Sequence, residues 1–331
     1  MLPLLRDHRR AAARLLPPEV FAYYAGGSGE ERSLREAHAA WGRARLLPRV
    51  LRDVSQVDTG VTVLGQRCAT PVLVAPTASH GLAHPDGEVA TAAGTAAAGS
   101  LLVLSTRADR PIADVAAAAG PWWYQVYLLR DRELTAENVR RAAAAGASAV
   151  VLTGDTPYVG RKRRTGEVPR GAGELGDPAA TLADIGWLAA AAGLPVLVKG
   201  VLRADEAAAC VAAGAAGVIV SNHGGRQLDR ALATAEALPP VARALRGSGA
   251  EVFVDGGIRS GLDVLVALAS GARAVLLGRP VLWALAAGGA AGVTAALDAV
   301  TDDLAHVLAL AGARELSEVT DDLLAPAPGR H

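Results

Sequence analysis

A histidine that can serve as a general base stands in the segment VSNHGGRQLD, residues 220–229. The imidazole of His223 exchanges protons near neutral pH, and Arg226 carries a guanidinium that can bind a carboxylate through two parallel hydrogen bonds. Asp155, at the end of another apolar run, is suited to orient the imidazole and to stabilise its protonated form. These three side chains predict proton abstraction from a substrate that carries a carboxylate.

A second group of residues predicts a phosphate-binding site. The sequences DGG, residues 255–257, and GR, residues 278–279, follow two further apolar runs, and Arg259 lies just beyond the first of them. Glycines let backbone N–H groups approach phosphate oxygens, and arginine supplies fork-shaped charge. Lys199 ends another run and can place a charge beside a ring that becomes anionic on reduction. A base and a carboxylate clamp beside such a redox cofactor suggest dehydrogenation of a 2-hydroxy acid.

The elements that must position these side chains repeat eight times along the chain. Near-continuous apolar runs lie at 71–77, 101–106, 122–128, 149–155, 195–201, 217–222, 251–257 and 274–279. Such runs are typical of parallel strands buried on both faces, and the alanine-rich stretches between them, which end in glycine, are typical of helices. The pattern predicts an α/β fold of the (β/α)8 TIM barrel type, with the active site at the carboxyl ends of the strands.

Polar or charged residues end all eight runs, which a purely structural barrel does not need. Gln125 and Tyr127 are two positions apart and therefore share one face of a strand. Each residue also has a structural interpretation: a lone histidine is more often structural, Asp155 can cap a helix, Lys199 can be a solvated cation, and Tyr127 can pack in the core. Their convergence at one end of the barrel favours the functional interpretation.

Length and composition predict one domain over residues 1–331, with an N-terminal helical extension over 1–70 and an active-site loop over 156–181. The 33 basic and 33 acidic residues balance, which argues against a nucleic-acid partner. Two cysteines, a charged N-terminal segment and no recognised membrane-spanning run predict a cytoplasmic protein. His80 and His84 are four positions apart, but Pro85 disfavours a helical metal site, so we expect no metal.

Several segments together resemble the FMN-dependent 2-hydroxy-acid oxidase family, which includes glycolate oxidase, lactate oxidase and mandelate dehydrogenase. The most specific is VSNHGGRQLD, and the resemblance extends from about residue 21 to about residue 320. Supporting segments are LVKGV, VFVDGGIRSG, LLGRPVLWALAAGG, QVY and APTASHGLAHPDGE.

The resemblance implies an FMN cofactor. The residues expected to bind it are Pro76, Thr77, Ala78, Ser105, Gln125, Thr153, Lys199, Ser221, Asp255, Gly256, Gly257, Arg259, Gly278 and Arg279. Lys199 is expected near N1 and O2 of the flavin. The residues from Asp255 to Arg259, together with Gly278 and Arg279, are expected to hold the ribityl chain and the phosphate.

The resemblance also implies a reaction. His223, with Asp155 as its partner, is expected to take the hydroxyl proton of an (S)-2-hydroxy acid, while the hydrogen on the substrate carbon passes as hydride to flavin N5. Tyr23 and Arg226 are expected to bind the substrate carboxylate, and Tyr127 its hydroxyl or carboxylate. The product is a 2-oxo acid, with reoxidation by O2 or another acceptor. Family members are often tetramers, so a homo-oligomer is expected.

The sequence departs from the family at several substrate positions. Lys162 stands where a second carboxylate-binding arginine is usual, so either Lys162 or a neighbouring arginine takes that role. Arg107 stands where glycolate oxidases carry a bulky aromatic residue, and Gly154 replaces a larger residue. The loop after Asp155 is short, which suggests a larger, aryl substrate such as mandelate or 4-hydroxymandelate. Alternatives are oxidative decarboxylation by a flavin monooxygenase, a redox-neutral flavin reaction, and a non-catalytic phosphate-binding barrel.

Overall fold

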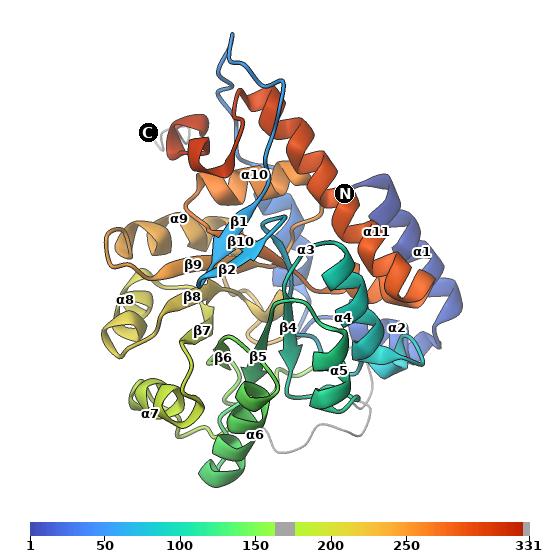
Figure 1. Ribbon diagram of the computed structural model, residues 1–331, viewed down its shortest axis with the longest axis vertical. Helices are drawn as coiled ribbons and strands as arrows, with labels where there is room; N and C mark the ends of the chain where they lie inside the picture. Colours follow the sequence, from blue (N-terminus) through green and yellow to red (C-terminus); the bar gives the residue numbers. More distant parts are fainter. Residues whose placement is uncertain (163–175, 327–331) are drawn as a thin grey trace.

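The computed structural model describes residues 1–162 and 176–326, and its central element is a closed barrel of eight parallel strands (Figure 1). The strand order around the barrel is β10-β3-β4-β5-β6-β7-β8-β9. The strands are β3 (Val72–Val74), β4 (Leu102–Ser105), β5 (Trp122–Val126), β6 (Val150–Thr153), β7 (Val196–Val201), β8 (Gly217–Val220), β9 (Glu251–Asp255) and β10 (Ala274–Leu277). Each lies within one of the eight predicted runs, which confirms the (β/α)8 fold.

The interior of the barrel is filled by apolar side chains. Trp123 meets Phe253 edge to face, with 5.3 Å between ring centroids, and both are fully buried. Leu73, Val151, Leu197, Ile219 and Leu276 pack in the same interior cluster. Because this core blocks the barrel axis, any site on the axis is confined to one end.

Eight α-helices follow the eight strands and cover the outside of the barrel (Figure 1). They are α4 (Gly87–Ala97), α5 (Ile112–Ala118), α6 (Arg132–Ala144), α7 (Ala183–Ala192), α8 (Ala204–Ala212), α9 (Thr234–Ala244), α10 (Gly261–Ala269) and α11 (Arg279–Ala311). Alanine favours the helical state, and side-chain caps start two of them: Asp131 accepts from the Leu134 N–H, and Ser260 from the Asp263 N–H.

Helix α11 is long and apolar enough to cross a membrane, with a mean hydropathy of 1.6 over its most apolar window. The sequence does contain an uncharged stretch here, residues 280–297, which the sequence-based expectation overlooked. In the structure 61% of that window is buried inside the protein. The helix packs against α1 (Pro3–Leu15), α4 and α10, and its backbone departs from helical geometry at Gly288 and Gly289. These contacts are those of a core helix.

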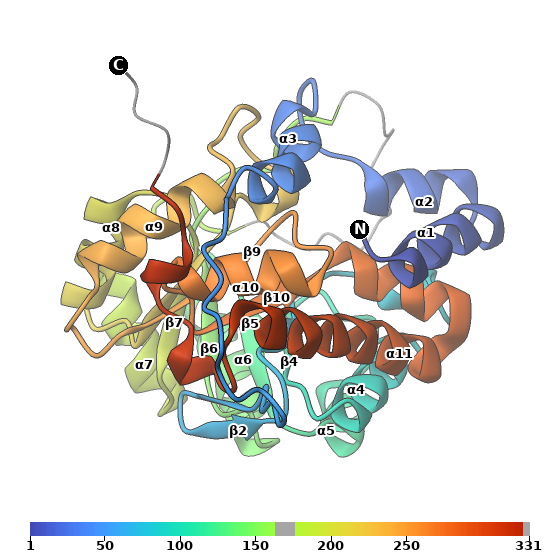
Figure 2. The same cartoon turned by 90° about the horizontal axis from the view of Figure 1, so that it is seen from above.

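The N-terminal extension closes both ends of the barrel. Three helices, α1, α2 (Pro18–Ala25) and α3 (Arg32–Trp41), lie in the first 41 residues of the extension. The antiparallel hairpin β1 (Val61–Val63) and β2 (Gln66–Cys68) was not predicted. Figure 2 shows α2 and α3 beyond one end of the barrel and the hairpin beyond the other.

The two caps contact the barrel differently. At the carboxyl ends of the strands, Trp41 Nε1 donates to the carbonyl of Gly256 at 2.8 Å. At the opposite end, Val61, Val63 and Cys68 join the apolar interior cluster, which the sequence periodicity of so short a hairpin did not reveal. The hairpin therefore covers one end of the barrel with apolar side chains, and the cavity described below lies at the carboxyl ends of the strands.

Within residues 1–162 and 176–326, the remaining regular elements are four short 3-10 turns, η1 (His80–Leu82), η2 (His223–Gly225), η3 (Leu316–Glu318) and η4 (Asp321–Leu323). Of the predicted active-site loop, residues 163–175 lie outside the described residues. The described part before them is joined to the extension, because Lys162 and Gly29 form an isolated parallel bridge.

Candidate active site

A cavity lies at the carboxyl ends of the strands, and all eight strands or the segments that follow them contribute to its lining. Most of the predicted site residues line it: Tyr23, Pro76, Thr77, Ala78, Ser105, Arg107, Tyr127, Lys162, Lys199, His223, Arg226, Asp255, Gly256, Gly257, Arg259, Gly278 and Arg279. The other four lie behind this lining: Gln125, Asp155 and Ser221 hydrogen-bond to residues of the lining, and Thr153 accepts a hydrogen bond from Gln125.

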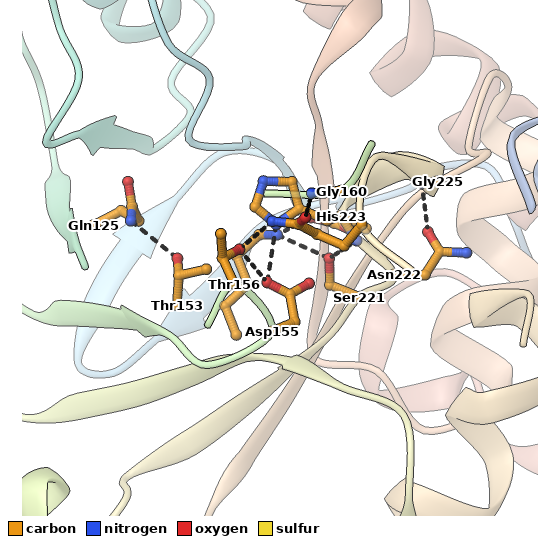
Figure 3. Close-up of polar contacts among 12 residues, drawn as sticks. Gln125, Thr153, Asp155, Thr156, Gly160, Ser221, Asn222, His223 and Gly225 are labelled. Atoms are coloured by element: carbon orange, nitrogen blue, oxygen red, sulfur yellow. Dashed lines mark hydrogen bonds and ion pairs between the residues drawn. The ribbon is translucent and has the colours of Figure 1, made fainter. Parts of the chain in front are cut away.

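The imidazole of His223 and the carboxylate of Asp155 form the central pair of the site (Figure 3). His223 Nδ1 lies 2.9 Å from Asp155 Oδ1, and Thr156 Oγ1 donates to the same oxygen at 3.1 Å. Burial alone would raise the pKa of Asp155, but His223 and, more weakly, Lys199 hold it below its usual value. Asp155 is therefore an anion that orients the imidazole, which is the predicted arrangement and not a helix cap.

The backbone around His223 is held in an unusual conformation. His223 has φ +56°, a left-handed value that is uncommon outside glycine. Its N–H donates to Ser221 Oγ at 3.0 Å, and the Gly225 N–H donates to Asn222 Oδ1 at 3.3 Å. Side chains of the segment thus hold its own turn, and strain of this kind gathers at functional sites.

Asp155 fits beside β7 because residue 200 is a glycine. Gly200 has φ +105°, and a Cβ atom at this position would lie 2.5 Å from the Cβ of Asp155. The pairing of β7 with β8 also shifts register between Lys199 and Val201. The glycine of the LVKGV segment is therefore required by the position of the carboxylate.

Lys199 is buried in an ion pair and is not a solvated cation. Only 4% of the residue is exposed, its Nζ lies 3.0 Å from Asp255 Oδ2, and it donates to Ser221 Oγ at 2.8 Å. Burial alone would lower the pKa of Lys199, but Asp255 and Asp155 raise it above its usual value. The cavity therefore keeps a fixed positive charge at neutral pH.

A row of side-chain hydrogen bonds crosses three neighbouring strands beside this cation. Ser105 Oγ donates to Gln125 Oε1 at 3.1 Å, and Gln125 Nε2 donates to Thr153 Oγ1 at 3.0 Å. Gln125 is only 2% exposed, so its amide is fixed by these two partners. The arrangement agrees with the predicted polar edge for a flat heterocycle.

The predicted phosphate end contains two desolvated guanidinium groups. Arg279 donates to the carbonyls of Tyr24, Gly26 and Gly224 at 2.8 to 3.0 Å, and Arg259 donates to the carbonyl of Ile258 at 2.6 Å. Burial lowers the pKa of Arg279 to about 9 and that of Arg259 to about 10.

The glycines beside these cations bring the backbone close to the extension. Gly257 has φ +84°, and a Cβ there would lie 2.1 Å from the carbonyl oxygen of Ala37. Carbonyls, and not carboxylates, hold both guanidinium groups, so an anion is needed to offset their desolvation. Among the described side chains, Asp255 Oδ1 is also buried without a partner. This end of the cavity fits a polyhydroxylated chain that ends in a phosphate.

The predicted carboxylate-binding residues gather around the ring of Tyr23. The guanidinium of Arg226 lies 5.0 Å, and Lys162 Nζ 5.2 Å, from the centre of that ring. Arg226 Nη1 donates to the carbonyls of Tyr23 at 2.6 Å and Gly26 at 3.0 Å. Burial and the nearby Arg226 and Arg279 lower the pKa of Lys162 to about 7. Lys162 therefore reaches the predicted place, while its neighbours Arg163 and Arg164 lie outside the described residues.

Tyr127 and Arg107 form a second cation–tyrosine pair in the cavity. The Arg107 guanidinium lies 5.0 Å from the centre of the Tyr127 ring, and burial raises the pKa of the Tyr127 hydroxyl. Because Tyr127 lines the cavity, its role is not confined to core packing.

Sequence reasoning missed several residues of the cavity wall, among them Tyr24, Thr156 and Gln227. Gln227 Oε1 accepts from the Gly160 N–H at 2.8 Å, and Gln227 Nε2 donates to Thr156 Oγ1. Tyr24 donates its hydroxyl hydrogen to the carbonyl of Ser79 at 2.5 Å. Each directly follows a predicted site residue in the sequence. That adjacency is the signal that could have identified them.

The described residues hold no cluster of metal-ligating side chains. His80 is buried between Thr77 and Thr91, at 2.6 and 2.8 Å from their hydroxyl oxygens. Its Nε2 partner, Thr77, lines the cavity, so His80 supports the cavity wall.

Comparison with known proteins shows which family the chain is similar to. The model of the FMN-dependent dehydrogenase family matches residues 12–172 and 164–326. The chain is 40% identical to an L-lactate oxidase of Nostoc sp., with 97% of each chain covered. It is 41% identical to a peroxisomal (S)-2-hydroxy-acid oxidase of Oryza sativa subsp. japonica, covering 96% of this chain and 94% of the relative.

Solved structures of mandelate oxidase share the fold throughout. One with (S)-mandelic acid has a TM-score of 0.92 at 41% identity, with 97% of both chains covered. Another with 2-hydroxy-phenylacetamide has a TM-score of 0.91 at 42% identity, again with 97% of both chains covered. The similarity therefore spans the barrel and the extension.

Proposed function

The chain belongs to the FMN-dependent 2-hydroxy-acid oxidase family, and we propose that it oxidises an (S)-2-hydroxy acid to the 2-oxo acid with His223 as the base. The observation that carries this assignment is the 2.9 Å contact between His223 Nδ1 and Asp155 Oδ1. With Nδ1 engaged by an anion, Nε2 is the ring nitrogen left to accept the proton of the substrate hydroxyl. Asp155 then stabilises the imidazolium.

Other side chains of the cavity bind and orient the substrate. Arg226 and Lys162, placed over the ring of Tyr23, supply the charge that holds the substrate carboxylate. Tyr127 supplies a hydroxyl from the cavity wall. Carboxylate, hydroxyl and base are thereby fixed in one orientation, which lowers the entropic part of the barrier.

The residues present fit FMN. Arg259, Arg279 and the glycines at 256–257 would hold the phosphate, and Lys199 together with the Ser105–Gln125–Thr153 row would hold the polar edge of the ring. Bound FMN supplies the acceptor for the two electrons and the hydrogen that leave the substrate carbon. The charge on Lys199 favours an anion beside it.

We further propose a substrate with a side chain larger than a methyl group, and similarity to mandelate oxidase makes aryl acids the first candidates. Half of the short loop behind this expectation, residues 163–175, lies outside the described residues. The test is anaerobic addition of lactate, glycolate, malate and mandelate to the yellow protein. We expect at least one to bleach the flavin absorbance, and a 2-oxo acid and peroxide to form when O2 is admitted. A carboxylic acid one carbon shorter would instead support oxidative decarboxylation.

Similarity to the relatives also supports a proposal for the electron acceptor and for the oligomeric state. Their names as oxidases support O2 as the acceptor. We propose a cytoplasmic protein that forms a homotetramer, as family members often do. Equal numbers of acidic and basic residues support the absence of a nucleic-acid partner, and the burial of α11 supports the absence of a membrane partner. Light scattering on the purified holoenzyme tests the tetramer, and a monomer would contradict it.

A further inference from the structure

Arg107 is a charged residue whose side chain has no protein acceptor among the described residues. Its guanidinium faces the ring of Tyr127, and its Nη2 is shielded from solvent without a hydrogen-bond partner. A buried guanidinium nitrogen without an acceptor is costly, because its N–H donors lose their water and gain no partner. Arg107 therefore requires an acceptor that the described part of the chain does not supply.

The backbone of Arg107 is fixed on both sides, so the side chain has a defined origin. Its N–H donates to Ser105 Oγ at 3.1 Å, and its carbonyl accepts from the Ser79 N–H at 3.1 Å. Both contacts are to segments that line the cavity at the ends of β3 and β4. The backbone position of Arg107 in the cavity wall is thus fixed.

Except for Lys162, which is assigned to the substrate carboxylate, the other cations of the cavity already have acceptors among the described groups. Lys199 is paired with Asp255, while Arg226 and Arg279 donate to backbone carbonyls of the extension. The carboxylate of Asp155 is hydrogen-bonded to His223 and is therefore not a partner for Arg107. Among the described groups, positive charge in the cavity therefore exceeds negative charge near the substrate.

The unmatched charge lies around two different tyrosines. Lys162 and Arg226 lie over Tyr23, where the substrate carboxylate is assigned, and Arg107 lies over Tyr127. Arg107 is close enough to Lys162 to contribute to the lowered pKa of that lysine. Two neighbouring cation–tyrosine pairs fit a substrate with two anionic groups a few bonds apart better than a substrate with a single anionic group.

We propose that Arg107 selects substrates with a second carboxylate, so that the preferred class is the 2-hydroxydicarboxylic acids. The proposal rests on the proposed oxidation of a 2-hydroxy acid with a side chain larger than a methyl group, and it sets dicarboxylic acids ahead of the aryl acids that similarity to mandelate oxidase suggests. One carboxylate binds at Tyr23, and the carboxylate at the far end of the substrate accepts from Arg107. A neutral aryl side chain would leave the guanidinium without its acceptor.

The test compares acids of equal carbon number in the FMN-loaded enzyme. (S)-Malate is paired with (S)-2-hydroxybutanoate, and (S)-2-hydroxyglutarate with (S)-2-hydroxypentanoate, and (S)-mandelate is included. A desolvated charge-assisted pair predicts about ten- to hundred-fold higher kcat/KM for at least one dicarboxylate over its partner. In Arg107→Gln that ratio should fall to about one, whereas Arg107→Lys should keep part of it.

The control is Arg130→Gln, which removes an exposed arginine that follows β5 and does not line the cavity. It should leave the ratio unchanged. If monocarboxylates or mandelate are oxidised as efficiently as the dicarboxylates, or if Arg107→Gln keeps the ratio, the selection by Arg107 is wrong while the proposed function stands. If no acid reduces the flavin, the proposed function and this inference are both overturned.

Discussion

His223 Nδ1 lies 2.9 Å from Asp155 Oδ1, although the two residues are 68 positions apart in the sequence. Replacing Asp155 by asparagine removes the anion that orients and stabilises the imidazolium. We expect the rate of anaerobic flavin reduction by substrate to fall by about 10²- to 10⁴-fold with FMN content unchanged. Stopped-flow absorbance measures this rate.

A matched variant for the same carboxylate is Thr156→Val. It removes the hydrogen bond from Thr156 to Asp155 Oδ1, together with the one that Thr156 accepts from Gln227, and leaves the charge of Asp155 in place. We expect a loss of no more than about ten-fold. If the rate of flavin reduction falls equally in the two variants, the charge of Asp155 does not account for the loss.

Gly200 and Gly214 have nearly the same backbone angle but different surroundings. Their φ values are +105° and +101°, yet a Cβ on Gly200 would strike Asp155, and one on Gly214 would meet nothing within 4 Å. Alanine at either position should lower the free energy of unfolding by about 1–3 kcal/mol through backbone strain. Only Gly200→Ala should also slow flavin reduction. A similar slowing in Gly214→Ala would refute the contact as the cause.

Lys162 predicts a pH dependence of substrate binding. Its pKa is lowered to about 7, so its positive charge is present below that pH and is lost as pH rises through it. We expect KM for the hydroxy acid to rise between about pH 6.5 and 8.5 while kcat changes little. Lys162→Arg should remove this rise, because arginine stays protonated. Identical KM profiles for the two proteins would contradict the role of Lys162.

The buried pair of Lys199 and Asp255 predicts a stability effect. Lys199→Met leaves the Asp255 carboxylate buried without its counter-charge, so the free energy of unfolding should fall by about 3–5 kcal/mol. Denaturant titration at saturating FMN measures it. The control, Arg203→Met, breaks the exposed pair with Asp205 and should have no measurable effect. Equal stability of the two variants would contradict the buried pair.

The barrel was predictable because a strand buried on both faces has an unmistakable pattern. Each continuous apolar run contains one strand, although the strands are shorter than the runs, as with β3 (Val72–Val74) inside 71–77. Once the strands are known, the fold itself brings their carboxyl ends together. That is why His223, Lys199 and Gln125, which are far apart in the sequence, could be assigned to one site.

What could not be predicted depends on contacts between distant segments. The β1–β2 hairpin is only three residues per strand, and its burial comes from the barrel interior beneath it. All but one of the carbonyls that hold Arg226 and Arg279 belong to the extension, and no spacing in the sequence reveals them. Residues 280–297 illustrate a further limit, since a core helix and a membrane span share the same composition.

The most direct test of the central claim is anaerobic flavin reduction in His223→Ala. The variant should purify yellow, because His223 is not among the residues assigned to hold FMN. Addition of a hydroxy acid that bleaches the wild-type protein should leave its flavin absorbance unchanged on the same timescale. Bleaching at the wild-type rate would contradict the assignment of His223 as the base.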